Sequence, residues 1–299
     1  MRPATLRAGD KIGIVSTARK IYPEEIQSAI DVMRSWELEA VPGKSIGAEH
    51  FQFAGDDEQR RKDLQSMLDD DSIKAILFAR GGYGTVRIID DLDWRKFLKR
   101  PKWLCGFSDV TVIHSHLLSV YNLPSVHSIM AVNFATATPE SVESLRKVLF
   151  GETLSYEIPP HGFNRTGKAK GILCGGNLSL LYSLNGTPSD IDTAGKIFFI
   201  EDIDEHLYHV DRMMMAMKRA GKLENIAGLI VGYFTDMKNK DESNPFGKTA
   251  YEIIAEHAGE FDFPVCFGFP AGHEPDNRAI VMGEEWKLET GEKVKLFQS

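Results

Sequence analysis

The stretch that runs from Trp103 to Asp109 has the residue types of a nucleophilic turn. An apolar run ends at Gly106, and Ser108 and Asp109 follow just before a helical pattern begins. A serine on a tight turn between a strand and a helix holds its Oγ clear of the sheet, and N–H groups at the helix start can stabilise an oxyanion. Because Ser and Asp are also common helix N-caps, the alternative is a purely structural turn.

A serine nucleophile requires a base, and His273 is the best candidate among the nine histidines. It lies in the segment 267–277, which is rich in glycine and proline and follows an apolar run. A backbone held by such residues can aim an imidazole at a neighbouring hydroxyl. The alternative is a loop histidine without a partner.

A carboxylate that orients the histidine is the third group of such a site, and Glu201 fits this role best. Glu201 follows the apolar run 196–200, and a carboxylate at the end of a buried strand requires a partner. In the alternative, Asp202 and Asp204 cap the positive end of the next helix, and Glu201 only belongs to the same acidic run.

The same acidic region permits a second chemistry, metal-dependent hydrolysis. Asp202, Asp204, His206 and His209 offer oxygen and imidazole ligands within a few residues. Their spacing differs from the His-Glu-x-x-His pattern of zinc peptidases. We therefore keep a metal hydrolase as an alternative only, and expect neither a metal nor another cofactor.

A glycine-rich loop, Arg80-Gly81-Gly82-Tyr83-Gly84, follows the apolar run 73–79. It lacks the Gly-x-Gly-x-x-Gly and Walker patterns of nucleotide sites, but its backbone can approach another group very closely. One of its N–H groups could therefore serve as an oxyanion donor. Arg80 could bind a substrate carboxylate through its planar guanidinium, or it could pair with one of the nearby acidic residues.

The elements that must position these residues alternate between strand and helix in the first half. Buried strands are predicted over 11–16, 73–79 and 102–107, and helices over 23–36, 57–69 and 109–120. This alternation is typical of right-handed βαβ units and of a parallel sheet covered on both faces. Since sites in such sheets lie at the carboxyl ends of the strands, the glycine loop and Ser108 are expected at one edge.

The second half has a mixed pattern that predicts an α+β unit. The turn-rich stretch 148–170 separates it from the first half. Strands are predicted over 196–200, 227–233, 264–267 and 279–296, helices over 205–220 and 247–259, and a hairpin turn at 289–292.

Composition limits the class of protein. A chain of 299 residues with 42% hydrophobic residues can form about two domains. The net charge of -8 argues against a broad phosphate-binding face. No apolar run has the length of a secretory core or membrane span, and the three cysteines lie far apart. We therefore expect a cytoplasmic protein that binds neither nucleic acid nor a membrane.

Five motifs occur in the order seen in LD-carboxypeptidases, and together they resemble that family over nearly the whole chain. The family consists of serine peptidases and includes muramoyltetrapeptide carboxypeptidases and microcin C self-immunity proteins. The motifs cover residues 79–84, 106–109, 174–178, 199–202 and 268–273. The resemblance implies a triad of Ser108, Glu201 and His273, with oxyanion donors from the backbone of Gly82 and Asp109.

The resemblance also implies an α/β fold with the site between two domains. A flavodoxin-like N-terminal domain with a parallel sheet is expected over 1–150, a linker over 151–168, and a smaller α+β domain rich in β structure over 169–299. Substrate contacts are expected from Arg80, Gly81, Tyr83 and Asn177. The family further favours a homodimer.

The function implied is hydrolysis of the amide between the L-centre of a diamino acid and a terminal D-alanine in murein tetrapeptides, during peptidoglycan recycling. The alternative within the family is cleavage of a peptide-nucleotide amide, as in the microcin C self-immunity proteins. Those proteins carry an additional aromatic loop over the nucleotide. No such insertion contains any of the four tryptophans, Trp36, Trp94, Trp103 and Trp286, so the sequence favours the carboxypeptidase.

Overall fold

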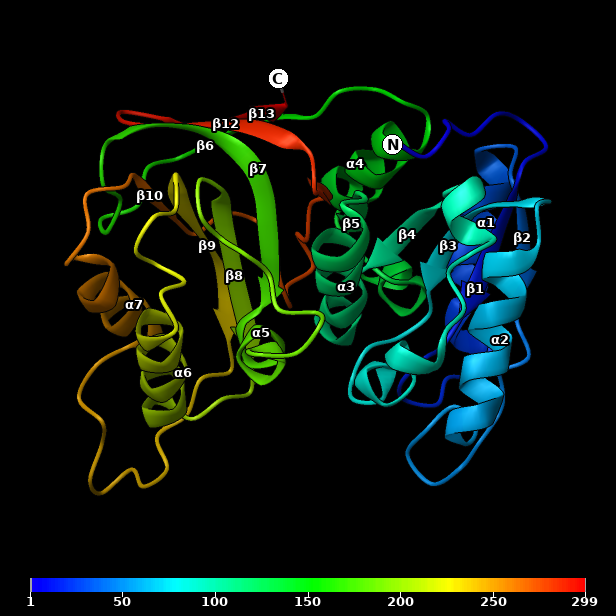
Figure 1. Cartoon of the computed structure of the whole chain (residues 1–299), viewed down its shortest axis with the longest axis horizontal. Helices are drawn as coiled ribbons and strands as arrows, with labels where there is room; N and C mark the ends of the chain where they lie inside the picture. The colour runs from blue at the N-terminus through cyan, green and yellow to red at the C-terminus, as the bar shows by residue number, and fades with distance from the viewer. Residues whose placement is uncertain (1, 299) are drawn as a thin grey trace.

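The computed structural model describes residues 2–298, which form two β-sheets with helices packed around and between them (Figure 1). The first sheet has the strand order β11-β5-β4-β3-β1-β2. Its strands are β1 (Lys11–Val15), β2 (Glu39–Pro42), β3 (Ile73–Phe78), β4 (Trp103–Gly106), β5 (Ser125–His127) and β11 (Ile280–Met282). Strands β1 to β5 run parallel in the flavodoxin-like order 2-1-3-4-5, which confirms the predicted sheet.

The helices of the first half are α1 (Gln27–Ser35), α2 (Asp57–Asp69), α3 (Thr111–Tyr121) and α4 (Pro139–Leu149). Short 3-10 helices span Pro23–Ile26, Thr85–Arg87, Ile89–Asp91, Phe97–Lys99, Ser108–Val110 and Ala131–Ala135. Helix α3 lies between the two sheets and is buried over its first eight residues (Figure 1). It therefore fixes how the turn at Ser108 faces the second sheet.

The second sheet has the strand order β10-β9-β8-β7-β12-β13-β6. Its strands are β6 (Ser155–Ile158), β7 (Gly167–Asn177), β8 (Ile197–Ile203), β9 (Gly228–Thr235), β10 (Val265–Phe267), β12 (Glu285–Thr290) and β13 (Val294–Gln298). Strands β7 to β10 are parallel, whereas β12, β13 and β6 continue the sheet in antiparallel fashion. The helices α5 (Leu178–Leu184), α6 (Leu207–Arg219) and α7 (Ala250–Ala258) complete this half. The predicted helices and the β12–β13 hairpin are confirmed.

The predicted division of the chain differs from the structure in two places. Strand β6 lies inside the predicted linker 151–168 and pairs with β13 at the edge of the second sheet. Strand β11 belongs to the predicted C-terminal domain, yet it pairs with β5 of the first sheet, with Ile280 opposite His127. The pairing of β6 and β11 is set by contacts with residues far away in the sequence, which the local pattern of these short strands does not show.

The two halves also share a hydrophobic core. One cluster of buried apolar side chains contains Leu77 and Val126 of the first sheet together with Phe199 and Trp286 of the second. This shared core fixes the two sheets relative to one another. Among residues 2–298, no helix has both the length and the apolar character needed to cross a lipid bilayer.

Candidate active site

Ser108 occupies a sharp turn at the carboxyl end of β4. Phe107 is still extended, but Ser108 has a φ of 60°, and a short 3-10 helix leads from it into α3. A residue other than glycine rarely adopts positive φ, and such strain is common at strand-to-helix turns that present a nucleophile. Ser108 is partly exposed, while its neighbours Phe107 and Asp109 are buried.

The glycine loop after β3 lies directly against Ser108. A Cβ built on Gly81 would lie 2.9 Å from Cβ and 3.0 Å from Oγ of Ser108. Gly82 and Gly84 have φ values of 115° and 156°, and a Cβ on Gly84 would lie 2.7 Å from the carbonyl oxygen of Thr17. The loop therefore needs glycine both for its conformation and for its close approach to the serine.

The side chain of Asp109 holds this loop in place, a role that the sequence analysis did not identify. Its Oδ2 accepts a hydrogen bond of 2.8 Å from the N–H of Thr85, and the carboxyl group is buried. Burial raises the pKa of Asp109 to about 6, although hydrogen bonds from Thr85 and Gly84 act in the opposite direction. The residue after the serine thus joins the serine turn to the glycine loop.

Glu201 of β8 and His273 of the loop after β10 form a hydrogen-bonded pair. Nδ1 of His273 lies 2.7 Å from Oε2 of Glu201, whose side chain is fully buried. Glu201 lies within β8, beside a register shift in the pairing of β8 with β9, rather than at the strand end expected from sequence. Bulges of this kind redirect side chains near active sites.

The backbone on both sides makes room for this pair. Gly272 has a φ of 132°, and a Cβ there would lie 3.1 Å from Oε2 of Glu201. A Cβ on Gly232 would lie 2.3 Å from the carbonyl oxygen of Ala271. The loop that carries His273 is therefore folded tightly over Glu201.

Ring packing brings the histidine and the serine turn together across the two sheets. The rings of Phe107 and His273 have their centroids 4.7 Å apart. Among residues 2–298, Oγ of Ser108 has no hydrogen-bond partner, so the contact between the serine turn and His273 is made by Phe107 and not by a bond from the serine. Burial favours neutral His273, but the negative charge of Glu201 and its hydrogen bond outweigh burial and raise the pKa of His273.

A cavity of about 210 Å³ opens beside His273 between the two halves. Phe107, Ile129 and Asn133 line it from the first half, and Ile203 and Pro275 line it from the second. It is smaller than the roughly 300–1,000 Å³ of pockets for drug-sized ligands. A small group bound there would lie next to the imidazole.

The side chain of Asn177 is buried and caps α5. Its Nδ2 donates to Oδ1 of Asp202 over 2.8 Å, and its Oδ1 accepts from the hydroxyl of Ser179 and the N–H of Leu180. Its own N–H donates to Oγ1 of Thr111, at the start of α3. These bonds join the two halves close to the site, and a substrate contact by Asn177 stays a prediction.

The other predicted substrate-binding side chains are partly or largely exposed. Arg80 forms an ion pair of 3.3 Å with Glu25, and 37% of its side chain is exposed. Tyr83 is exposed and lies near the ring of Phe53, with centroids 6.2 Å apart. The acidic partner considered for Arg80 therefore exists, and substrate contacts by both residues stay predictions.

The alternative metal site has no ligand set. Among residues 2–298, no cluster of three or more His, Cys, Asp or Glu side chains is arranged to hold a metal ion. Each candidate has its own partner instead: Asp202 with Asn177, Asp204 with Lys238, His209 with Glu205, and His206 with the ring of Tyr208. These residues therefore supply no ligand set for the metal hydrolase that the sequence left open as an alternative.

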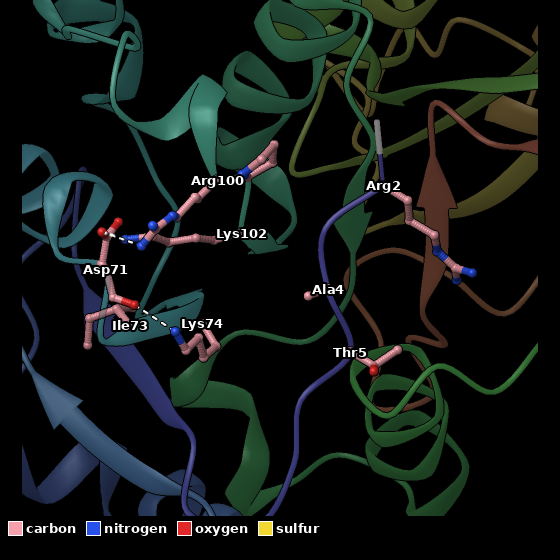
Figure 2. A pocket seen from close by; sticks show the side chains of 9 residues that line it. Arg2, Ala4, Thr5, Asp71, Ile73, Lys74, Arg100 and Lys102 are labelled. Carbon is pink, nitrogen blue, oxygen red and sulfur yellow. Dashed lines mark hydrogen bonds and ion pairs between the residues drawn. The ribbon is translucent and has the colours of Figure 1, made fainter.

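A second cavity, of about 300 Å³, lies at the opposite edge of the first sheet, where β3 and β4 begin (Figure 2). Its basic side chains already have partners. Arg100 pairs with Asp71 over 2.7 Å, and the ammonium groups of Lys74 and Lys102 donate to backbone carbonyls. This cavity is therefore remote from Ser108 and has its charges satisfied within the fold.

Comparison with known proteins identifies relatives along the full length. The LD-carboxypeptidase N-terminal domain model matches residues 12–128, and the C-terminal domain model matches residues 170–288. A probable murein peptide carboxypeptidase of Bacillus subtilis is 35% identical over 305 residues, covering 100% of this chain and 94% of that protein.

Solved structures show the same fold. The crystal structure of muramoyltetrapeptide carboxypeptidase from Oxalobacter formigenes matches with a TM-score of 0.86 and 28% identity, over 97% of this chain and 99% of that chain. The microcin C7 self-immunity protein matches with a TM-score of 0.90 and 19% identity, over 100% of this chain and 98% of that chain. The two matched domains and the full-length similarity show that this chain belongs to the LD-carboxypeptidase family.

Proposed function

We propose that the protein hydrolyses the amide between the L-centre of a diamino acid and the terminal D-alanine of murein tetrapeptides, with Ser108 as the nucleophile. The observation that carries this proposal is the 2.7 Å hydrogen bond between His273 and buried Glu201, beside the turn that presents Ser108. Serine, imidazole and carboxylate in this arrangement match the roles of an acyl-transfer triad.

In the proposed reaction, Nε2 of His273 takes the proton of the Ser108 hydroxyl while Oγ attacks the amide carbonyl carbon. The tetrahedral intermediate collapses when the same nitrogen protonates the departing amine, and D-alanine leaves. Water then attacks the acyl-enzyme with His273 again as base, which releases the shortened peptide and restores Ser108. Glu201 holds Nδ1 protonated, so that Nε2 is free to accept, and stabilises the imidazolium.

The N–H groups of Gly82 and Asp109 are assigned to the oxyanion. Among residues 2–298, the N–H of Gly82 has no hydrogen-bond acceptor. The N–H of Asp109 lies in the first turn of the 3-10 helix, whose first internal bond is made by Val110 to Phe107. Two free donors beside a nucleophile are what an oxyanion hole requires.

The substrate class is supported by the family and by the site. Relatives along the full length are named as murein peptide and muramoyltetrapeptide carboxypeptidases. The small cavity beside His273 suits a leaving group as small as alanine. Arg80, Gly81, Tyr83 and Asn177 stay assigned to substrate binding, with Asn177 acting through the buried cap that it forms with Asp202.

Release of D-alanine from a purified murein tetrapeptide, followed by mass spectrometry, tests the proposal. The parent protein should release D-alanine, and Ser108→Ala should lower kcat by about 10⁴-fold or more. Ser183→Ala is a matched control, because its exposed hydroxyl donates only to a helix carbonyl. A peptide-nucleotide amide serves as the competing substrate, and its preferred cleavage would contradict the proposal.

A role in peptidoglycan recycling, a cytoplasmic location and a homodimer complete the proposal. Loss of the gene product should cause tetrapeptides to accumulate in the cell extract. Light scattering of the purified protein should give twice the monomer mass.

A further inference from the structure

Arg19 lies beside the glycine loop because of the strand order. It follows β1, and β1 lies next to β3, whose carboxyl end leads into the glycine loop. The N–H of Arg19 donates to the carbonyl of Gly81 over 3.4 Å, and the carbonyl of Arg19 accepts the hydroxyl of Ser16 over 2.7 Å. The backbone of Arg19 is therefore tied to the loop that faces the nucleophile.

The stem of the Arg19 side chain lies on Gly82. A Cβ built on Gly82 would lie 2.4 Å from Cγ and 2.5 Å from Cδ of Arg19. On the preceding residue, a Cβ built on Gly81 would lie 2.9 Å from Cβ of Ser108. Gly81 and Gly82 are consecutive, so their Cα atoms are only about 3.8 Å apart. The arginine stem, which contacts Gly82, is therefore separated from Ser108, which contacts Gly81, by only these two glycine residues.

The guanidinium of Arg19 has no partner within the fold. Among residues 2–298, its side chain makes no ion pair or hydrogen bond, and the residue is exposed. Arg80, which lies in the same region, is paired with Glu25. Arg7 is also exposed without an ion pair, but it precedes β1 and so lies at the opposite edge of the sheet.

We propose that Arg19 binds a carboxylate of the peptide substrate, an inference that rests on the proposed function. A peptide cleaved at its last residue ends in a free carboxylate next to the scissile amide, and a guanidinium binds carboxylates through two parallel N–H donors. A side-chain carboxylate of a diaminopimelate residue has the same chemistry. Arg19 is thus a specificity-determining residue that acts through its side chain, whereas Gly82 acts through its backbone.

The test compares Arg19→Gln with the parent on three peptides: the tetrapeptide acid, its C-terminal amide, and the acid with lysine in place of diaminopimelate. On the tetrapeptide acid, Arg19→Gln should lower kcat/KM by about tenfold to a hundredfold, mainly through KM, as for loss of a charged hydrogen-bonded pair. Arg19→Lys should recover part of this loss. Arg7→Gln should match the parent, because its side chain is exposed and remote.

The three peptides identify which carboxylate is bound. If the penalty disappears on the amide, the terminal carboxylate is the ligand, and if it disappears on the lysine peptide, the side-chain carboxylate is. Either result supports the proposal. An equal penalty on all three peptides would instead indicate a packing role on Gly82, and no penalty would show that Arg19 does not bind substrate; both overturn the proposal.

A failure of the proposed function can be distinguished from a failure of the proposal about Arg19. If the parent protein releases D-alanine from no tetrapeptide, the reaction itself is wrong, and this inference falls with it. If the parent releases D-alanine and Arg19→Gln keeps the parent's selectivity between acid and amide and between the two diamino acids, only the inference about Arg19 is wrong.

Discussion

The two parts of the candidate site differ in their hydrogen bonding: the His273–Glu201 pair is bonded, whereas Ser108 is not. Glu201 of β8 and His273 of the loop between β10 and β11 already share a 2.7 Å hydrogen bond, and the carboxylate is fully buried. In the first sheet, Ser108 is strained and partly exposed, and its Oγ has no hydrogen-bond partner within residues 2–298. The proposed acid-base pair is therefore already bonded, while the proposed nucleophile is presented from the end of β4.

This difference shows which contact the fold must maintain for activity. The loop around Gly272 folds tightly over Glu201, and it is also tied to the first half, where the N–H of Thr138 donates to the carbonyl of Pro275 and Nε2 of His127 lies 3.1 Å from Oδ1 of Asn277. The packing of Phe107 on His273, the shared core and the hydrogen bond from the N–H of Asn177 to Thr111 join the two halves around the serine turn and this pair. Hydrogen bonds between a nucleophile and its base are often long or absent in free enzymes and tighten with substrate. Three substitutions should affect the two parts of the site separately, with effects that decrease from Glu201 to Gly81 to Asp109.

Glu201→Gln should disrupt the interaction between Glu201 and His273. It removes the charge that stabilises the imidazolium, so kcat should fall by about 10³-fold to 10⁴-fold. The pH profile gives a second readout, because His273 must be neutral to accept the serine proton. In the parent, the raised pKa of His273 should place the acid limb of kcat/KM at a higher pH than for an ordinary histidine, and activity should appear as the pH rises through it.

In Glu201→Gln, burial remains while the raising charge is gone, so the acid limb should move to lower pH. Measurement of kcat/KM across pH for both proteins checks this shift. An acid limb that stays in place after the substitution would show that His273 is not the titrating base.

Gly81→Ala should displace Ser108 or the glycine loop and leave the His273–Glu201 pair unchanged. Its Cβ would lie 2.9 Å from Cβ of Ser108, so the serine or the loop must move. Activity should fall by about a hundredfold or more, since misplacement by about 1 Å can cost that much. Gly162→Ala is the control, because a Cβ there meets nothing within 4 Å and should leave kcat unchanged. Equal activities of the two variants would contradict the geometry of the glycine loop.

Asp109→Ala should loosen the same loop more mildly. It removes the acceptor of the Thr85 N–H, so the donor at Gly82 loses its fixed position, and kcat should fall by about tenfold to a hundredfold. Asp109→Asn keeps an acceptor oxygen and should recover most of the activity. If Asn and Ala lower kcat equally while both proteins stay folded by circular dichroism, the carboxylate has another role.

The sequence predicted the elements that obey local rules. Clear periodicity marks the apolar runs of β1, β3 and β4 and the amphipathic helices α6 and α7. Because Ser108 and the glycine loop follow the carboxyl ends of parallel strands, they were expected at one edge of the sheet. The motif order supplied Glu201 and His273, which the structure brings within hydrogen-bond distance. The strand and helix predictions succeed because hydrophobic patterning acts over short stretches. The association of Glu201 with His273 was implied by the family resemblance.

Other features depend on contacts that no local pattern carries. The pairing of β11 with the first sheet joins residues about 150 positions apart, and the bulge beside Glu201 is set by β9. The positive φ of Ser108 is a strained state that residue type does not reveal. Asp109 and Arg19 gain their roles only because β1, β3 and β4 are neighbours in the sheet.

A double-mutant cycle shows whether Ser108 works together with His273 across the interface of the two halves. The values of kcat/KM for D-alanine release should be measured for the parent, Ser108→Ala, His273→Ala and the double variant. Residues that act as one unit are strongly non-additive, so the double variant should be no slower than the slower single variant. Losses that multiply in the double variant would mean that the two residues act independently, and would contradict the account.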